Sequence, residues 1–356
     1  MNTRLAVEPI SPLARACAVS LLGLLACTCA SATTTVCVTD AAGLQAALNA
    51  ADGSTDTTVI EVARGTYNVG GSPLSFHSTS MTQGQLDITG GYNADCSALI
   101  KNPALTVLDG AGVSRVLDIV SANGISVRYL TIQNGAAPSN FTGGMIVEST
   151  NGGVIVDYNI FRNNSATNFA GLGAYIFGPS ATSALHVDGN LIVGNSASSS
   201  FAAGVVENLG TGSTYVTNNT IAGNTTTSNS SSNDGSLVLR FGTAPFASNN
   251  IAWGNTRADL DVANAPLLMN NDIGVIGNGG IIDAASAGNL AVDPQFSATT
   301  DFHLQATSPL LGAGTLTPAG NLPTIDIEGH PRSYNGLVDM GAYERGDKIF
   351  ADGYDN

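Results

Sequence analysis

The sequence is poor in charged residues, and positive charge is the scarcest. Lys and Arg number 12 against 27 Asp and Glu, which gives a formal net charge of −15. A protein with this negative field is a poor partner for nucleic acid or for an anionic membrane surface. Long apolar runs are missing too, since no stretch of the mature chain approaches the roughly 20 apolar residues that a membrane-spanning helix needs. The sequence therefore predicts neither nucleic-acid binding nor a transmembrane segment.

Several motifs that signal catalysis or nucleotide binding are also absent. The sequence has no Walker loop, no nucleophile elbow and no Gly-Gly-x-Gly-x-Asp repeat. The clustered Asp and His-Gly motifs of polygalacturonase-like hydrolases are missing, as is an Arg-rich lyase signature. Because a lyase for pectin or alginate usually needs cations to neutralise the substrate carboxylate, the scarcity of Arg and Lys favours a neutral glycan over a polyanion as a partner.

The first 32 residues have the pattern of a secretory signal peptide. Two arginines precede an apolar stretch over residues 16–26, and Ala30-Ser31-Ala32 then gives a small-x-small cleavage pattern. Residues 1–32 are therefore predicted to be a signal peptide that is cleaved after Ala32, which places the protein outside the cell or on its outer surface. The alternative is a lipoprotein cleavage box that ends at Cys27, with Cys27 as the acylated residue.

Cysteine is rare in the rest of the chain. Only Cys37 and Cys96 follow the predicted signal peptide. A pair of cysteines in an oxidising compartment predicts one disulfide, and two unpaired thiols are the alternative. Two cysteines are too few for a cysteine-ligated metal site.

A unit of six residues repeats through the middle of the chain. Residues 159–164 begin with Asn, continue with an apolar step and two variable residues, and close with Asn. Residues 190–195, 219–224 and 250–255 share this pattern, and residues 129–134 are a copy in which Tyr replaces the first Asn. The closing asparagines follow one another at intervals of 29 to 31 residues and are Asn134, Asn164, Asn195, Asn224 and Asn255.

This period predicts an all-β fold, a right-handed parallel β-helix, over residues 59–292. Each period holds three brief strands, which cannot bury a face alone but can do so if each coil stacks on the next. At the corners Asn tolerates left-handed backbone angles, and its amide can hydrogen-bond the same Asn one coil away. The five closing asparagines are therefore predicted to form one structural column.

The exposed first coil of such a solenoid needs a cover. Residues 33–58 are predicted to be the N-terminal cap, with a helix over residues 40–51 that Asp40 begins. The apolar positions of this helix lie on one face at helical spacing and are Leu44, Ala47, Leu48 and Ala51.

The C-terminal part contains the most specific motifs of the chain. They are Asp293-Pro294-Gln295-Phe296, Asp301-Phe302-His303-Leu304, Ser308-Pro309, Asp326-Ile327-Glu328-Gly329-His330-Pro331-Arg332 and Asp339-Met340-Gly341-Ala342-Tyr343-Glu344. Residues 293–346 resemble the closing segment of choice-of-anchor Q domain proteins, a bacterial surface-protein family with a pectate-lyase-like β-helix. The resemblance implies this fold and a surface location, and it implies no particular activity. Residues 347–356 form a tail that is either a sorting tag or a frayed end.

Arg332 is the only cation among the carboxylates of this C-terminal segment. It is predicted to pair with a carboxylate and lock the cap, which makes Arg332, Asp339 and Glu344 structural residues. A calcium site built from the carboxylates, which include Asp326 and Glu328, is the alternative.

Asp157 and Asp188 are the candidate catalytic or metal-binding residues. The repeats align them at equivalent places on neighbouring coils, and strand alternation turns both side chains outward. Two carboxylates about 5 Å apart raise the pKa of one of them or bind a cation, and calcium is the cofactor considered. The alternative is a solvated surface pair without a chemical role.

These observations predict a secreted or cell-surface monomer that is not an enzyme. Its long sheet face would contact polysaccharide or other cell-surface partners. The side chains available for stacking are Phe169, Tyr175, Phe177, Phe201, Tyr215 and Trp253, with packing in the core or at the coil edge as the alternative for most of them. A polysaccharide lyase or glycoside hydrolase that uses Asp157 and Asp188 is the first alternative. A passive displayed domain is the second.

Overall fold

The computed structural model describes residues 32–137, 142–178, 181–227, 235–241, 245–277 and 280–345. The predicted signal peptide up to residue 31, the alternative acylation site Cys27 and the tail at 347–356 lie outside these residues. From Thr33 onward the chain belongs to one compact unit.

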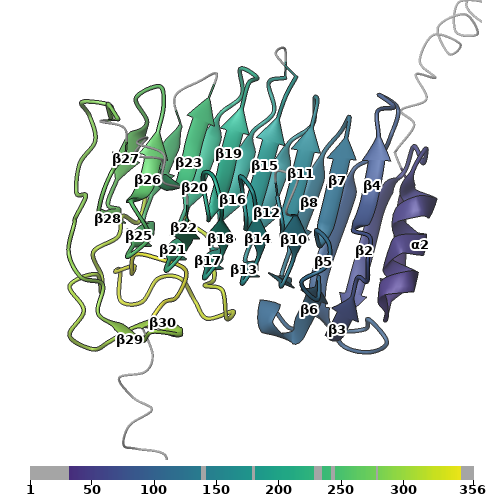
Figure 1. Cartoon of the computed structure of the whole chain (residues 1–356), viewed down its shortest axis with the longest axis horizontal. Helices are drawn as coiled ribbons and strands as arrows, with labels where there is room; N and C mark the ends of the chain where they lie inside the picture. The colour runs from purple at the N-terminus through teal and green to yellow at the C-terminus, as the bar shows by residue number, and fades with distance from the viewer. Residues whose placement is uncertain are drawn as a thin grey trace, which may run out of the picture. The chain divides into compact units, whose positions relative to one another are not determined.

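Three parallel sheets form the sides of the coils (Figure 1). The nine-stranded sheet consists, in spatial order, of β1 (Thr33–Val38), β2 (Thr57–Ala63), β5 (Leu86–Tyr92), β8 (Ile125–Arg128), β12 (Val154–Asp157), β16 (Leu185–Asp188), β20 (Thr214–Thr217), β24 (Phe246–Ser248) and β27 (Leu267–Met269). The eight-stranded sheet consists of β3 (Gly65–Asn68), β6 (Thr106–Asp109), β9 (Thr131–Gln133), β13 (Ile160–Arg162), β17 (Leu191–Val193), β21 (Thr220–Ala222), β25 (Ile251–Trp253) and β28 (Asp272–Ile273). The seven-stranded sheet consists of β4 (Leu74–Ser78), β7 (Leu117–Ser121), β11 (Met145–Ser149), β15 (Leu172–Ile176), β19 (Gly204–Asn208), β23 (Gly235–Phe241) and β26 (Ala258–Val262).

Two smaller sheets complete the strands. A four-stranded parallel sheet lies between the eight-stranded and seven-stranded sheets along the chain and consists of β10 (Ala136–Ala137), β14 (Ser165–Ala166), β18 (Ser196–Ala197) and β22 (Thr225–Thr226). An antiparallel pair near the C-terminus consists of β29 (Phe296–Ala298) and β30 (Asp301–Leu304). A short 3-10 helix, η1 (Pro103–Leu105), precedes β6.

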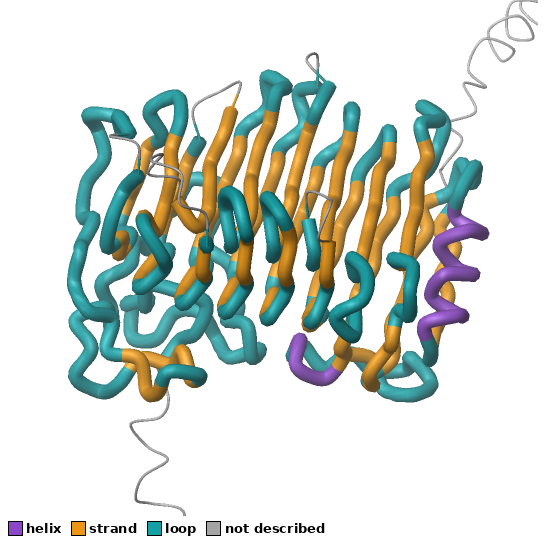
Figure 2. The backbone as a smooth tube through the Cα atoms, in the orientation of Figure 1, coloured by secondary structure: helices purple, strands orange, loops and turns teal. Residues whose placement is uncertain are grey.

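Each coil passes through the large sheets in the same order, and each strand pairs with its equivalent in the next coil (Figure 2). The pairing keeps register over most of the sheets, for example between Val154 and Leu185 and between Met145 and Leu172, and it shifts between Glu61 and Ala63 where β2 pairs with β5. Connections between parallel strands of one sheet are right-handed in nearly all proteins, which gives the coil its hand. The predicted all-β fold, a right-handed parallel β-helix, is confirmed.

The core runs along the axis of the coils. Alternate residues of each strand point inward and stack with the equivalent residues of neighbouring coils, as Val127, Val156 and Val187 do in the nine-stranded sheet. All three are fully buried. Stacking of this kind gives every short strand the apolar cover that it lacks alone.

The helix α2 (Ala41–Ala51) covers the first coil, as the sequence predicts. The carboxylate of Asp40 accepts a hydrogen bond from the backbone N–H of Gly43 at 2.7 Å and caps the helix. The predicted apolar face is buried. Gln45 donates to the carbonyl of Ser75 and accepts from its N–H, both at 2.8 Å, which ties the helix to β4.

The predicted disulfide is confirmed. Cys37 in β1 and Cys96, which follows β5, are bonded with a Cα–Cα distance of 5.8 Å. The bond closes a loop of 59 residues around the N-terminal coils. It therefore ties the outermost strand of the solenoid to its second coil.

Asparagine ladders run along two corners of the coils. In the closing column, the Oδ1 atom of each Asn accepts from both the backbone N–H and the side-chain amide of the Asn one coil earlier, and the members are Asn164, Asn195, Asn224 and Asn255. The column ends at Asp259, whose Oδ1 accepts both bonds from Asn255. A second column consists of Asn159, Asn190, Asn219, Asn250, Asn271 and Asn289.

Asn134 was predicted to belong to the closing column, and this prediction is wrong by one residue. The register pairs Arg162 with Gln133, so Asn164 lies beside Gly135, whose N–H donates to the Oδ1 of Asn164. Asn134 instead has φ 53° and donates to the carboxylate of Asp109.

The reason given for the asparagines also needs correction. The left-handed angle belongs to the residue before the ladder Asn, for example Asn163 with φ 55° and Gly194 with φ 64°. The preceding residue therefore turns the chain, while the ladder Asn supplies the hydrogen bonds between coils.

Candidate functional site

The predicted pair Asp157 and Asp188 faces outward on the nine-stranded sheet. The two residues are direct partners in the parallel register of β12 and β16. Their side chains are only 16% and 13% exposed, so the alternative of a fully solvated pair is wrong. The residues that follow each aspartate are Tyr158, whose ring stacks on Tyr129 at 5.2 Å, and Gly189, against which the Tyr158 ring lies.

Each aspartate has one basic neighbour. The Nε atom of Arg128 donates to the Oδ2 of Asp157 at 3.4 Å, and the Nδ1 of His186 lies 3.2 Å from the Oδ2 of Asp188. The Oδ1 atom of each aspartate is buried without a hydrogen-bond partner within the described part of the chain. Arg128 lies directly across from Asp157 in the register of β8 and β12, and His186 precedes Asp188 by two residues on the same face of β16.

Burial and the facing carboxylate of Asp188 raise the pKa of Asp157 to about 7, against an ordinary value of 3.8. Burial also raises the pKa of Asp188. For His186, burial acts against protonation, but the hydrogen bond and charge of Asp188 outweigh it and raise the pKa. The arrangement can hold a proton near neutral pH.

The raised pKa predicts that Asp157→Asn stabilises the protein at high pH. The folded pair keeps a proton that the unfolded chain releases near pH 4, so the free energy of unfolding falls as pH rises from about 4 through about 7. At pH 8 the variant should gain about 1–3 kcal/mol, and at pH 4 almost nothing. Urea unfolding across this pH range measures the difference.

Asp87→Asn is the matched control, because Asp87 lies on the same face of the sheet and has Val59 and Ser126 as its partners in register. An equal gain in stability from Asp87→Asn would contradict the prediction.

The outer face of the seven-stranded sheet carries a second group of polar and aromatic side chains. One outward row takes one residue from each of six successive coils, in register, and contains His77, Val120, Glu148, Tyr175, Glu207 and Arg240. Glu148 and Glu207 therefore flank Tyr175 on the two neighbouring strands. Burial and the charge of Asp118 raise the pKa of Glu148.

Aromatic rings surround this row. Tyr175 stacks on Phe177 at 4.9 Å, Phe169 stacks on Phe201 at 5.8 Å, and the guanidinium of Arg240 lies 5.3 Å from the centre of the Phe201 ring. A Cβ atom added to Gly173 would lie 2.8 Å from the Tyr175 ring, so this glycine lets the ring lie down on the sheet. Phe169, Tyr175, Phe177 and Phe201 were all predicted as candidates for stacking, and they lie together on this face.

The C-terminal segment folds back onto the coils. The amide of Asn218 donates to the carbonyls of Asp339 and Gly341, at 3.2 and 3.3 Å, and the N–H of Ala342 donates to the hydroxyl of Thr220. Ile327 and Ala342 also pack against outward apolar residues of the eight-stranded sheet. The segment therefore covers part of that sheet.

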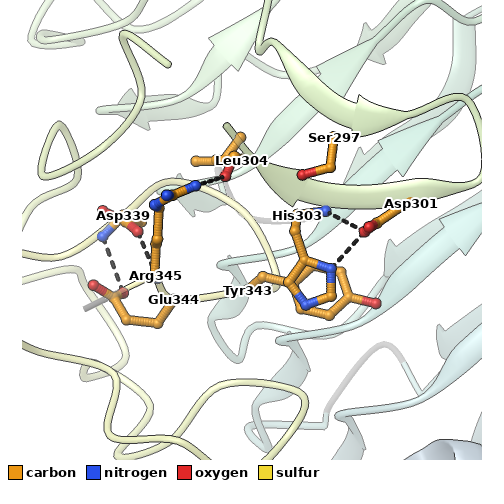
Figure 3. Close-up of a pocket in the computed structure, with 8 residues that line it drawn as sticks. All are labelled: Ser297, Asp301, His303, Leu304, Asp339, Tyr343, Glu344 and Arg345. Atoms are coloured by element: carbon orange, nitrogen blue, oxygen red, sulfur yellow. Dashed lines mark hydrogen bonds and ion pairs between the residues drawn. The ribbon is translucent and has the colours of Figure 1, made fainter. Parts of the chain in front are cut away.

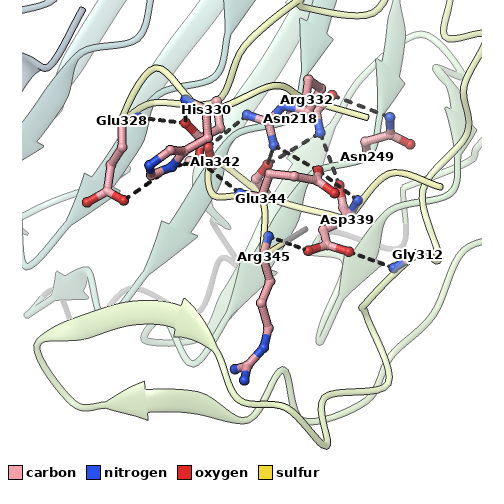
Figure 4. Close-up of polar contacts among 12 residues, drawn as sticks. Asn218, Asn249, Gly312, Glu328, His330, Arg332, Asp339, Ala342, Glu344 and Arg345 are labelled. Carbon is pink, nitrogen blue, oxygen red and sulfur yellow. Dashed lines mark hydrogen bonds and ion pairs between the residues drawn. The ribbon is translucent and has the colours of Figure 1, made fainter. Parts of the chain in front are cut away.

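Arg332 lies at the centre of this segment (Figure 4). It is 1% exposed, and its guanidinium donates to the carbonyls of Gly341 and Ala342 at 3.0 and 2.8 Å. The nearest carboxylate oxygen belongs to Glu344 at 3.8 Å, so the guanidinium mainly bonds backbone carbonyls rather than a carboxylate. Burial and the charge of Asp339 raise the pKa of Glu344 to about 8.

Asp339 and Glu344 bind backbone groups. The carboxylate of Asp339 accepts from the N–H groups of Gly312 and Arg345, and Glu344 accepts from the N–H of Asp339. These contacts support the structural roles predicted for both residues. A cavity of about 190 Å³ lies beside them and is lined in part by Asp301, His303 and Tyr343 (Figure 3).

Comparison with known proteins identifies a family without adding a function. A search of curated proteins and a search of solved structures gave no match. The resemblance of residues 293–346 to choice-of-anchor Q proteins lies beyond the matched part of the chain and is not confirmed. No helix within the described ranges has the length and apolar character needed to cross a bilayer. The model of DUF1565, described as a protein of unknown function, matches residues 39–274, which is more than half of the chain, and the protein therefore belongs to the DUF1565 family.

Proposed function

We propose that the protein binds neutral glycans through the outer face of the seven-stranded sheet. The observation that carries this proposal is the row in which Glu148, Tyr175, Glu207 and Arg240 follow one another across four coils, beside two stacked aromatic pairs. Carboxylates accept hydrogen bonds from sugar hydroxyls, and aromatic rings pack on the apolar C–H face of a pyranose.

The rigidity of the sheet favours such binding. The four residues Glu148, Tyr175, Glu207 and Arg240 project from β11, β15, β19 and β23, each of which is paired on both sides, so little backbone freedom is lost when a ligand binds. Tyr175 is 6% exposed and fixed by its ring contacts, whereas Phe177 is half-buried and Arg240 is exposed. The row thus combines a fixed centre with accessible side chains around it.

Charge favours a neutral ligand over an acidic one. The chain carries a formal net charge of −15, and two glutamates lie in the row itself. A polyuronate would meet repulsion from these carboxylates, while a neutral glycan would not. The disulfide between Cys37 and Cys96 supports a site of action in an oxidising compartment, in agreement with the predicted signal peptide.

The test is a binding measurement on the full mature chain with a panel of neutral and uronic-acid oligosaccharides, by calorimetry or glycan array. Phe177→Ala should weaken binding of a neutral ligand about tenfold because it removes a ring from the stacked pair. Phe246→Ala is the matched control, since Phe246 is a half-buried ring on the outer face of the nine-stranded sheet. The proposal fails if no neutral glycan binds, or if both variants lose affinity equally.

A second candidate function is glycan hydrolysis at Asp157 and Asp188. It is favoured by one observation, the pKa of about 7 for an aspartate that faces a second carboxylate, which is the property of a catalytic acid. Release of reducing ends from the same oligosaccharide panel, abolished by Asp188→Asn in a folded variant, would support it. Absence of turnover on the whole panel would exclude it for those substrates.

A further inference from the structure

One loop of the C-terminal segment brings three metal-binding side chains together. Each residue offers one ligand atom, and the three atoms lie within 4.8 Å of one another. They are a carboxylate oxygen of Asp326, a carboxylate oxygen of Glu328 and a ring nitrogen of His330. The Nδ1 of His330 is 3.4 Å from the Oδ2 of Asp326 and 3.8 Å from the Oε2 of Glu328. These three residues alternate along the chain, and their side chains leave the loop close together, as Figure 4 shows for Glu328 and His330.

Asp326 fixes the shape of this loop. It is fully buried, and its Oδ1 accepts from the N–H groups of both Glu328 and His330, at 2.9 and 2.8 Å. Its Oδ2 accepts from the N–H of Glu344 at 3.1 Å and remains within reach of His330. The loop is therefore organised around one carboxylate before any ligand arrives.

The side chain of His303, in β30, contacts Glu328. The Nε2 of His303 lies 3.1 Å from the Oε2 of Glu328, while its Nδ1 lies 2.5 Å from the Oδ1 of Asp301. The His303 ring also packs on Tyr343 with ring centres 4.0 Å apart (Figure 3). Asp301 thus orients His303, and His303 orients Glu328, in the manner of the outer groups that hold metal ligands in place.

We propose that Asp326, Glu328 and His330 bind a divalent transition metal, with Zn²⁺ as the best fit, and that Asp301 and His303 position Glu328. An imidazole ligand favours Zn²⁺ over Ca²⁺ or Mg²⁺, which take oxygen ligands. The Nδ1 of His330 already faces the carboxylates of Asp326 and Glu328, at 3.4 and 3.8 Å, so one ion could contact all three side chains.

The geometry leaves an open coordination position. The side chains of Glu328 and His330 are 33% and 41% exposed, so small rotations of both can close the site on an ion. The solvent side remains free for water or for an anionic or hydroxyl group of a ligand. A zinc ion held by three protein side chains, with a fourth position open to water or a bound molecule, is typical of catalytic sites. Structural zinc sites usually have four protein side chains.

The experiment uses the full mature chain after treatment with a chelator. Calorimetric titration with Zn²⁺ should show one ion bound per chain, and titration with Ca²⁺ should show at least tenfold weaker binding. Co²⁺ in place of Zn²⁺ should give the visible absorption of a bound ion, which reports the site directly. Thermal unfolding should shift upward with added Zn²⁺.

Two variants and one control locate the site. His330→Ala should weaken Zn²⁺ binding about 100-fold, and His303→Gln about tenfold, because the second residue acts through Glu328. His77→Ala is the control, since His77 is an exposed histidine on the seven-stranded sheet whose Nε2 lies 3.1 Å from the Oδ1 of Asp118. Circular dichroism checks that each variant is folded. The proposal is overturned if the wild type binds no Zn²⁺, if His330→Ala binds as tightly as wild type, or if Ca²⁺ binds more tightly than Zn²⁺.

Discussion

Replacement of Asn195 by Ala is expected to lower the free energy of unfolding by about 3–5 kcal/mol. The side chain of Asn195 accepts from the N–H and the amide of Asn164, and it donates to the carbonyl of Phe161 and to Asn224. All of these groups are buried. The substitution leaves several of them unpaired at once, and each unpaired buried group costs about 1–3 kcal/mol before the structure relaxes.

Urea unfolding followed by circular dichroism measures this loss. Asn163→Gly is the matched control, because Asn163 lies one residue before the ladder, is exposed and has φ 55°, and the equivalent residues of the next coils are Gly194 and Gly223. Glycine tolerates this angle, so the control should change stability by less than about 0.5 kcal/mol. If Asn195→Ala is equally mild, the hydrogen bonds of the column do not stabilise the coils as we infer.

Replacement of Arg332 by Met should have an effect of similar size, about 3–5 kcal/mol at pH 7. The guanidinium lies among the buried carboxylates of Asp326 and Glu344 and bonds two backbone carbonyls. A methionine has similar length but no charge, so the carboxylates lose their only buried cation within the described segment. The pKa of Glu344 should rise further as a result, because the charge of Arg332 lowers it.

The loss should be local and dependent on pH. Hydrogen exchange should increase most over residues 325–345, since this segment is the part that Arg332 holds together. The destabilisation should grow between pH 7 and pH 9, because Glu344, whose pKa is about 8, is largely protonated at pH 7 and needs a countercharge only once it ionises. Arg162→Met serves as the control, because Arg162 is exposed and bonds Gln133 on the coils. Equal effects of the two substitutions would contradict the assigned role of Arg332.

The fold could be predicted from sequence because its signal repeats. The short strands, the period of 29 to 31 residues and the Asn units all recur, so an error in one coil is corrected by the others. At the edge of the repeat this correction fails. The copy that ends at Asn134 lacks the first Asn, and the alignment slipped by one residue, which only the pairing of Gln133 with Arg162 reveals.

The candidate sites were predictable only in part. Asp157 and Asp188 occupy equivalent positions of adjacent repeats, so alignment alone placed them side by side. Their burial was not predictable, since strand alternation turns both side chains outward and gives no information on what packs around them. The row on the seven-stranded sheet requires the register of β11, β15, β19 and β23, where the repeats are less regular. His303 and Glu328 are 25 residues apart outside the repeats, and no period connects them.

The end of the closing column limits how the solenoid can grow. Each asparagine donates from its backbone N–H and its side-chain amide to the next member of the column, whereas the side chain of Asp259 only accepts and its backbone N–H donates to the carbonyl of Val275. Beyond this point the stack continues through β27 and β28 and through the second column, which runs on to Asn289. Duplication of an internal coil such as residues 165–195 would extend both columns and lengthen the molecule by about 4.8 Å. A coil inserted after Asp259 would extend only the second column, so the interior of the stack is where the solenoid can lengthen with both columns intact.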